Sequence, residues 1–311
     1  MPLRYTLRQL EYFVAVGEAG SIAAASHRVN VSSPSISAAI SQLEEELGVQ
    51  LFVRHHAQGL APTLPGHKLL DQAQIVLRQA AALRDLAGEL SGMVRGPLEL
   101  GCLSTFAQIV VPGLRRSFLD MYEEVRISQT EGDQASLFTW LRQARIDMAL
   151  SYDLDLPGDL HFTPILELPP LVAMSDTHSL AHLPTVSVQQ LAAYPMVLLD
   201  LPLSSDYFLS FFSRAGLRAN VHERTRDMAV MRSLVANGFG YSIVNHRPLN
   251  DMSPDGKPIR FIPLSGNARP MKLGLLMVAG TERTQLHKAF TAHAQEWLAA
   301  NATRLLGIGA A

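Results

Sequence analysis

Apolar residues recur at helical spacing through the first ninety positions, and strand-like apolar runs appear only after them. Intervals of three and four follow Thr6, which predicts a helix from 7 to about 18. A second helix ends near Asn30, and Pro34 opens a third over about 34–47. Two short helices joined by a tight turn are typical of a helix-turn-helix that binds DNA. A trihelical packing module has the same spacing, so the pattern alone leaves both interpretations open.

The residues after the third predicted helix indicate a small wing. Val49–Arg54 and the apolar stretch 60–64 predict two strands around the polar segment 55–59. His55 and His56 could approach phosphates there, but adjacent loop histidines are more often solvated. A metal site would need further ligands at matched spacing, so no metal is expected.

A heptad repeat predicts a long helix from about 65 to 90. Its apolar positions alternate at intervals of four and three: Leu69, Ala73, Val76, Ala80, Leu83, Ala87 and Leu90. This seam could pair with another chain or with the first helices of its own chain. We favour self-association over an ordinary amphipathic helix.

From residue 98 onward, short apolar runs alternate with helical stretches, which is α/β patterning. Strands are expected at 98–103, 125–130, 148–151, 196–199, near 221 and at 241–244, and helices at 106–122, 137–144, 208–215 and 228–237. Crossing segments near 164–174 and 261–278 join two such units, which predicts two lobes around a cleft.

Composition narrows the class of protein. The 311 residues suggest roughly two domains, and 48% hydrophobic residues supply enough apolar side chains for real cores. The net charge is −2, and residues 1–66 hold four arginines against five glutamates, which is few cations for a DNA-binding unit. Any attraction to nucleic acid must therefore be local.

The single cysteine, Cys102, excludes an internal disulfide, a disulfide-switched sensor and a multi-thiolate zinc site. It fits a reducing compartment. With no run of about 18 apolar residues, we expect a cytoplasmic protein without a membrane span.

Several motifs match one known family. They are Ala24-Ala25, Pro34, Ser37, Leu43-Glu44, Leu47-Gly48, Leu51-Phe52-Val53-Arg54, Pro62-Thr63 and Gly66, then Gly101, Pro112, Asp147 and Gly238-Phe239-Gly240-Tyr241-Ser242. With them the chain resembles the LysR-type bacterial transcriptional regulators over essentially its whole length. The resemblance implies a multi-domain protein: a winged helix-turn-helix over 1–64, a long linker and dimerisation helix over 65–91, and a two-lobed α/β effector domain over 92–311, similar to periplasmic binding proteins. Lobe I would comprise about 92–166 and 269–311, and lobe II about 167–268.

The chain departs from the family pattern where DNA is read, since Ser33 replaces a usual glutamine and Ala38 a frequent arginine. The remaining candidates for DNA contact are Ser33, Ser35, Ser37, Ser41 and Gln42 on the third helix, Arg28 on the second and Arg54 on the wing. Hydroxyls read base edges weakly, whereas glutamine can pair with adenine and Arg54 can reach a phosphate or the minor groove. Helix capping for Ser33 and a plain surface charge for Arg28 are equally open alternatives.

Ligands of two-lobed α/β domains lie where strand ends meet helix N-termini. The candidates at such positions are Ser104, Thr105, Thr130, Asp133, Ser204, Ser205 and Tyr207. N-capping is the alternative for Ser104 and Thr105. Asp133 would repel a carboxylate ligand or only cap the next helix, and capping is favoured.

We therefore expect a LysR-type regulator that binds double-stranded promoter or operator DNA as a homodimer or homotetramer. A small organic metabolite would change that binding by closing the cleft, and no cofactor is expected. No catalytic residues are assigned, because Gly-x-Ser-x-Gly, a Gly-rich phosphate loop with Lys and His-Glu-x-x-His are absent from the sequence. Two alternatives are a small-molecule enzyme with a helical regulatory module and a solute-binding protein. The helical first ninety residues and the lack of a signal peptide count against the second.

Overall fold

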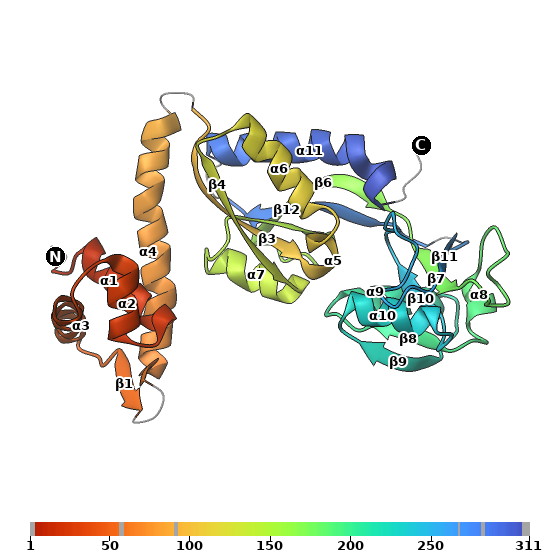
Figure 1. Ribbon diagram of the computed structural model, residues 1–311, viewed down its shortest axis with the longest axis horizontal. Coiled ribbons are helices and arrows are strands. Elements are labelled where there is room, and N and C mark those ends of the chain that lie inside the picture. Colours follow the sequence, from red (N-terminus) through yellow and green to blue (C-terminus); the bar gives the residue numbers. More distant parts are fainter. Residues whose placement is uncertain (1–3, 56–58, 90–92, 267, 281–283, 307–311) are drawn as a thin grey trace. The chain divides into compact units, whose positions relative to one another are not determined.

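The computed structural model describes residues 4–55, 59–89, 93–266, 268–280 and 284–306 (Figure 1). The chain divides into two compact units, Met1–Met93 with Arg142–Arg145, and Val94–Leu141 with Ile146–Ala311. The first unit has one hydrophobic core, and the second has a large core and a smaller one. Within the described residues, no helix has the length and apolar character that a membrane span requires.

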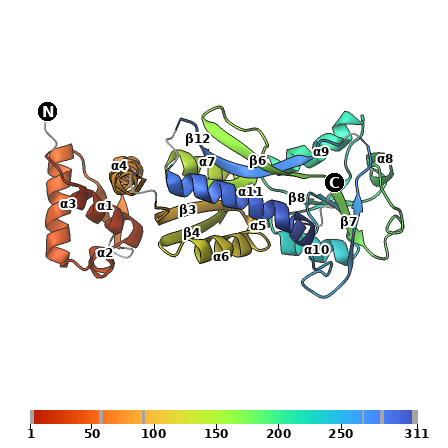
Figure 2. The ribbon, with the colours of Figure 1, turned by 90° about the horizontal axis from the view of Figure 1, so that it is seen from above.

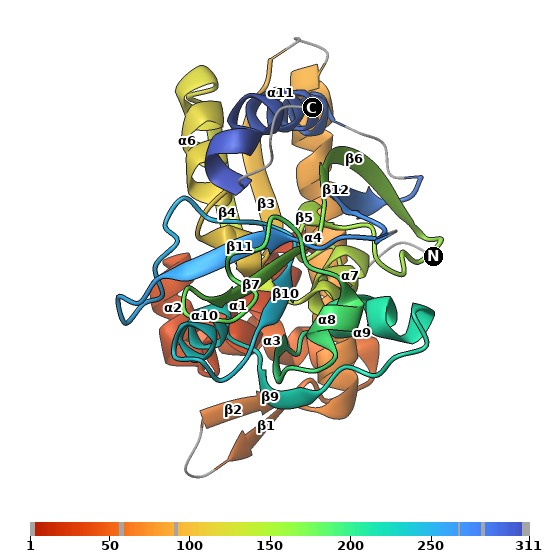
Figure 3. The ribbon, with the colours of Figure 1, turned by 90° about the vertical axis from the view of Figure 1, so that its right-hand side faces the viewer.

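The first unit is a winged helix-turn-helix followed by a long helix, as the sequence predicts. Its elements are α1 (Leu7–Ala19), α2 (Ile22–Val29), α3 (Ser33–Leu47), β1 (Phe52–His55), β2 (Gly59–Pro62) and α4 (Leu64–Glu89). The strands pair antiparallel and form a hairpin that extends from the helices (Figure 3).

Local hydrogen bonds explain where these helices begin. Thr6 Oγ1 accepts a bond from the Gln9 backbone N–H at 3.2 Å, while Gln9 Oε1 accepts one from the Thr6 N–H at 2.8 Å. This capping box starts α1 at the predicted residue. Ser32, one residue before the predicted candidate Ser33, is the N-cap of α3.

The N-terminal half of α4 packs against α1 of the same unit. Ala73 is only 4% exposed, and Leu69 and Val76 pack against the core that α1 and α3 form. A side chain in place of Gly17 would lie 2.7 Å from Leu70, so the two helices approach closely where α1 carries glycine. This half of the heptad seam is therefore already covered within its own chain.

Lobe I of the second unit is a five-stranded sheet in the order β4-β3-β5-β12-β6. Its strands are β3 (Gly96–Leu103), β4 (Val125–Gly132), β5 (Met148–Tyr152), β6 (Leu160–Leu168) and β12 (Met271–Val278), and its helices are α5 (Ser104–Ala107), α6 (Val111–Met121), α7 (Gln134–Arg142) and α11 (Gln285–Leu306). The helices α6 and α11 cover one face and α7 the other (Figures 1 and 2). Rings of Phe118 and Phe290, 5.1 Å apart, join α6 to α11.

Three expectations for the helices need correction. The single helix expected over 106–122 is two helices, because Pro112 lacks an N–H and clashes with the preceding turn, so it stands in the first turn of α6. The helices expected from 137 and 208 begin earlier, at Gln134 and Ser204. The C-terminal helix α11 was not predicted at all.

Lobe II contains the antiparallel sheet β10-β7-β11 and the parallel pair β8-β9. Its elements are β7 (Leu171–Ser175), α8 (Val188–Leu191), β8 (Met196–Leu199), α9 (Ser204–Arg214), β9 (Val221–Thr225), α10 (Met228–Ala236), β10 (Ser242–Val244) and β11 (Ile259–Pro263). A parallel bridge between Met196 and Tyr241 joins the pair to the sheet. The chain passes between lobes from β6 to β7 and returns from β11 to β12, which confirms the two predicted crossing segments.

Gly240 occupies a position that only glycine fits. Its φ is +149°, and a Cβ there would lie 2.2 Å from the carbonyl oxygen of Pro195. The next residue, Tyr241, donates its N–H to that same oxygen at 3.0 Å. The close approach therefore brings β10 beside β8.

We expect Gly240→Ala to reduce the free energy of unfolding by on the order of 3 kcal/mol, since both backbone strain and a steric clash oppose it. Gly238→Ala is the matched control, because its φ is +81° but nothing lies within 4 Å of the added Cβ. Strain alone should cost about 1 kcal/mol there. Urea unfolding of both variants tests this, and equal losses would contradict the steric account.

Candidate functional site

The exposed face of α3 is the candidate surface for DNA. Ser35, Ser41 and Gln42 are exposed on it, together with Ala38, whereas Ser33 and Ser37 are half-buried. The Ser33 hydroxyl donates to the Ser26 hydroxyl at 3.2 Å. Because Ser32 caps the helix, the capping role considered for Ser33 is wrong.

Other candidates for DNA contact already have partners within the unit. Arg28 forms an ion pair with Glu18 at 2.6 Å, and Gln42 Oε1 accepts a hydrogen bond from Gln9 Nε2 at 3.2 Å. Arg28 remains 61% exposed, so this pair can exchange for a phosphate at little cost. The side chain of Arg54 lies outside the described residues.

Glu44 links α3, the second helix of the helix-turn-helix, to the wing. Its Oε1 accepts hydrogen bonds from the backbone N–H groups of Leu51 at 2.7 Å and Phe52 at 3.3 Å. A carboxylate is a strong acceptor for such donors, so it fixes the start of β1 relative to α3. Glu44 therefore has a structural role and adds no free acidic group to the DNA-facing surface.

The second candidate site is a cavity between lobes I and II. The space between its lining atoms, including the part open to solvent, is about 480 Å³. Lobe I contributes Leu103, Ser104, Thr105, Gly132, Asp133, Gln134 and Tyr152, and lobe II contributes Leu199, Leu201, Pro202, Ser204, Phe208, Met228, Ile243, Val244, Asn245 and His246. A second hollow adjoins it and shares Ser104, Thr105 and His246.

Four of the seven effector-site candidates line this cavity: Ser104, Thr105, Asp133 and Ser204. Neither Ser104 nor Thr105 caps α5, because the N-cap residue is Leu103 and makes no side-chain bond. Asp133 Oδ1 accepts the Ser136 N–H at 2.8 Å, which is the capping contact favoured from the sequence.

The other three candidates do not line the cavity. Thr130 was expected to end its strand, but β4 continues to Gly132 and Thr130 pairs with Gly101 inside the ladder. Ser205 is half-buried in the first turn of α9. The Tyr207 hydroxyl donates to the carbonyl oxygen of Arg269 at 2.5 Å, so it belongs to the crossing between the lobes.

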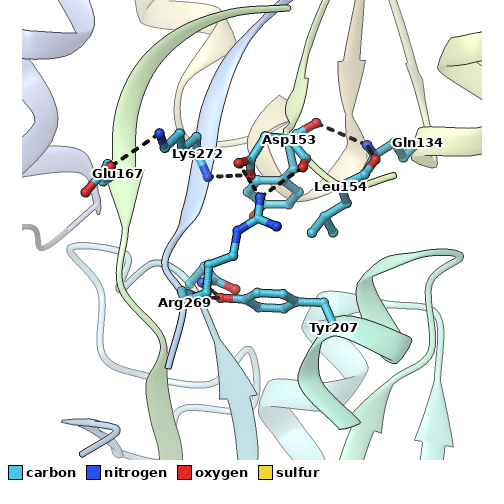
Figure 4. Close-up of polar contacts among 9 residues, drawn as sticks. Gln134, Asp153, Leu154, Glu167, Tyr207, Arg269 and Lys272 are labelled. Carbon is cyan, nitrogen blue, oxygen red and sulfur yellow. Dashed lines mark hydrogen bonds and ion pairs between the residues drawn. The ribbon is translucent and has the colours of Figure 1, made fainter. Parts of the chain in front are cut away.

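A polar network surrounds that crossing (Figure 4). Asp153 pairs with Arg269 at 2.5 Å and accepts the Lys272 backbone N–H at 2.7 Å. Burial raises the pKa of Tyr207 to about 12, with the Asn245 hydrogen bond acting in the opposite direction, so its hydroxyl stays protonated and can donate. The network holds the chain where it returns from lobe II to lobe I.

Two buried amides connect this network to the cavity. Asn245 Nδ2 donates to the carbonyl oxygen of Leu168 at 2.9 Å and to the Tyr207 hydroxyl at 3.3 Å. Gln134 Nε2 donates to the carbonyl oxygens of Tyr152 at 3.1 Å and Leu154 at 2.8 Å (Figure 4). Their oxygens, Asn245 Oδ1 and Gln134 Oε1, are buried without a hydrogen-bond partner among the described residues.

His246 is the third buried polar residue of the cavity. Burial, together with the charge of Arg232, lowers the pKa of His246 to about 4, so its ring is neutral near pH 7. Its Nδ1 is also buried without a partner in the part of the chain that the structure describes. Sequence reasoning missed His246 and Asn245, although both directly follow a predicted strand and the strand-end rule could have found them.

Cys102 lies in β3 and is fully buried. Burial, with a smaller contribution from Glu131, raises the pKa of its thiol to about 12, so the reactive thiolate is not formed at neutral pH. This environment is that of a core residue.

Comparisons with known proteins match one family model to each of the two units. The family model "Bacterial regulatory helix-turn-helix protein, lysR family" matches residues 7–67, and the "LysR substrate binding domain" model matches 91–299. The chain is 26% identical over 293 residues to the transcriptional activator protein LysR of Escherichia coli, covering 94% of this chain and 93% of that one. It is 27% identical over 239 residues to the dual regulator OxyR of the same species, covering 76% and 78%.

Among solved structures, a putative LysR family transcriptional regulator from Pseudomonas aeruginosa superposes with a TM-score of 0.65 at 32% identity. The match covers 95% of this chain and 100% of that one. The similarity in fold to that structure therefore includes both units of this chain.

The pKa of His246 predicts a pH dependence of stability. Between about pH 6.5 and pH 4 the unfolded chain binds a proton that the folded chain excludes, so the free energy of unfolding falls as the pH falls. From pH 7 to pH 5 we expect wild type to lose about 2 kcal/mol more than His246→Gln. Denaturant titrations at both pH values measure this difference. His182→Gln, which changes an exposed histidine, is the control. Parallel curves for wild type and His246→Gln would contradict the burial of a neutral ring.

The heptad seam gives a second prediction. Leu83 is 70% exposed and Ala80 half-buried, whereas the side chain of Ala87 and the whole of Leu90 lie outside the described residues. We expect Leu83→Glu to reduce the oligomer mass in light scattering while the circular dichroism spectrum is retained. Leu64→Glu, at another highly exposed leucine of α4, should leave the oligomer mass unchanged. Val76→Glu should instead unfold the first unit, because Val76 packs against its core. An unchanged mass for Leu83→Glu would refute the pairing role.

Proposed function

This chain belongs to the LysR family of bacterial regulatory helix-turn-helix proteins, and we propose that a small molecule bound between lobes I and II controls its binding to promoter DNA. Proteins of this family are DNA-binding transcriptional regulators that work as oligomers and carry an effector-binding domain. We assign no catalytic step to the chain and place its action in the cytoplasm, where the chromosome is.

The cavity is the observation that carries this proposal. Ser104 and Asp133 come from lobe I, whereas Ser204 and Asn245 come from lobe II, so a bound molecule would contact both. Such a ligand favours the arrangement in which both sets of contacts form. By linkage, the same ligand changes DNA affinity only if DNA binds that arrangement better or worse than the open one.

The exposed face of α3 can distinguish base sequences, but a single DNA-binding unit would bind DNA with modest affinity. Ser35, Ser41 and Gln42 offer hydroxyl and amide groups that hydrogen-bond to base edges. Arg28 and Arg54 are the cations that would contact phosphates, and so few phosphate contacts give weak binding. Two linked units bound to neighbouring half-sites would recover affinity through their effective concentration.

Selection of the full chain against a random duplex DNA pool, at physiological salt, tests the DNA-binding role. We expect enrichment of a partly palindromic site, and at that site Gln42→Ala should weaken binding by about 5- to 150-fold. Gln72→Ala changes an exposed glutamine on α4 and should stay within about twofold of wild type. Salt-labile binding with no sequence preference would overturn the role assigned to α3.

A further inference from the structure

The polar wall of the cavity is rich in hydrogen-bond acceptors. Gln134 is 1% exposed and Asn245 is 3% exposed, and each has its NH2 group bonded to a backbone carbonyl. Rotating either amide would place oxygen against oxygen, so these orientations are fixed by their partners. Gln134 Oε1 and Asn245 Oδ1 have no partner among the described residues, so each can accept a hydrogen bond from a donor outside them.

The charge at the cavity is negative. Among its described lining residues Asp133 carries the formal charge, and neither lysine nor arginine is among them. His246 adds no positive charge, because burial keeps its ring neutral near pH 7. A ligand carboxylate would thus be buried beside another carboxylate without a paired cation, which is costly.

Of the helices that begin at the cavity, α5 and α9 have no side-chain cap, although at α9 the Ser204 and Ser205 N–H groups donate to the carbonyl oxygens of Pro202 and Leu201. The helices α7 and α10 do not compensate for the missing cation. A free helix start attracts anions, but two helices that begin at the cavity are already capped by the chain's own carboxylates. Asp133 accepts the Ser136 N–H of α7, and Asp227 Oδ1 accepts the Ala229 and Val230 N–H groups of α10 at 2.7 and 3.1 Å. These positions are therefore filled before any ligand arrives.

Arg232 is the arginine among the described residues that line the adjoining hollow. Its Nη2 donates to the backbone carbonyl oxygens of Asn250 and Met252. Burial lowers the pKa of Arg232, with the Asp251 charge opposing that effect. Its Nη2 is thus directed to the loop that follows β10, whereas its Nε is buried without a partner among the described residues.

We propose that the cavity selects a small molecule with an apolar body and a protonated amine, and discriminates against the corresponding carboxylate. This inference rests on the proposed function in taking the cavity as the effector site. An ammonium group has three N–H donors, and Asp133, Gln134 and Asn245 supply three acceptor side chains, one carboxylate and two amides. The side chains of Leu103, Phe208 and Met228 surround the apolar body.

Three probes with the same phenylethyl body test the proposal: 2-phenylethylamine, 2-phenylethanol and 3-phenylpropanoate. Calorimetric titration of the full chain at pH 7 should give the tightest binding for the amine, at least about tenfold tighter than the carboxylate, with the alcohol between them. Asp133→Asn should weaken amine binding by about tenfold and alter alcohol binding by less than about twofold. Asparagine still caps α7, so the fold is retained.

Asp227→Asn is the matched control, since it removes the same charge from the same kind of helix cap at a residue that does not line the cavity. It should leave amine affinity unchanged. Three results would overturn the proposal: preferential binding of 3-phenylpropanoate, amine affinity unaffected by Asp133→Asn, or binding by none of the probes.

Measuring DNA affinity with each bound probe separates this inference from the proposed function. If the carboxylate binds better and shifts DNA affinity, the amine preference is wrong while the regulatory role stands. If the amine binds as expected but leaves DNA affinity unchanged, the ligand class stands and the regulatory role is wrong.

Discussion

The requirement that buried polar groups be hydrogen-bonded organises the ligand-binding unit. The crossing between its lobes leaves backbone carbonyls at strand ends, where the ladder no longer supplies donors, and a buried group without a partner costs about 1–3 kcal/mol. Asn245 meets this need at Leu168, and Gln134 meets it at Tyr152 and Leu154. Because the donors of both amides are bonded to the backbone, these two side chains offer acceptors to the cavity. The chemistry available to a ligand thus follows from how the lobes are joined.

In the DNA-binding unit, several polar side chains are likewise bonded within the unit. Glu44 is bonded to the start of the wing, Arg28 to Glu18, and Gln42 to Gln9. These contacts make a well-defined surface from a segment with few cations. They also mean that binding DNA exchanges existing surface contacts for new ones, so the gain per contact is small and oligomerisation carries more of the affinity.

The parts of the fold that the sequence predicted well depend on neighbours in the chain. Caps such as Thr6, the spacing of apolar residues and the glycines after helices specify α1 to α4 locally, and the two-lobed α/β architecture follows from alternating runs. The misplaced or missed site residues depend on distant partners. Tyr207 bonds to Arg269 and Asn245 to Leu168, separated by 62 and 77 positions, and no local pattern reports such pairs. Likewise, whether the seam of α4 faces its own unit or another chain depends on packing against α1.

Asn245 and Gln134 both bond to backbone carbonyls and line the cavity, which affects how this protein could be converted into a sensor for other compounds. Asn245 bonds to Leu168 at the end of the strand that leads into lobe II, and Gln134 bonds to the carbonyls on either side of Asp153, which pairs with Arg269. Changing either amide would therefore alter the lobes and the ligand preference together. Leu103, Phe208 and Met228 contribute apolar side chains to the same wall, which carry no hydrogen bonds that a substitution could break. A library that randomises these three positions while keeping both amides would vary the shape of the recognised body and preserve the mechanical coupling of the lobes.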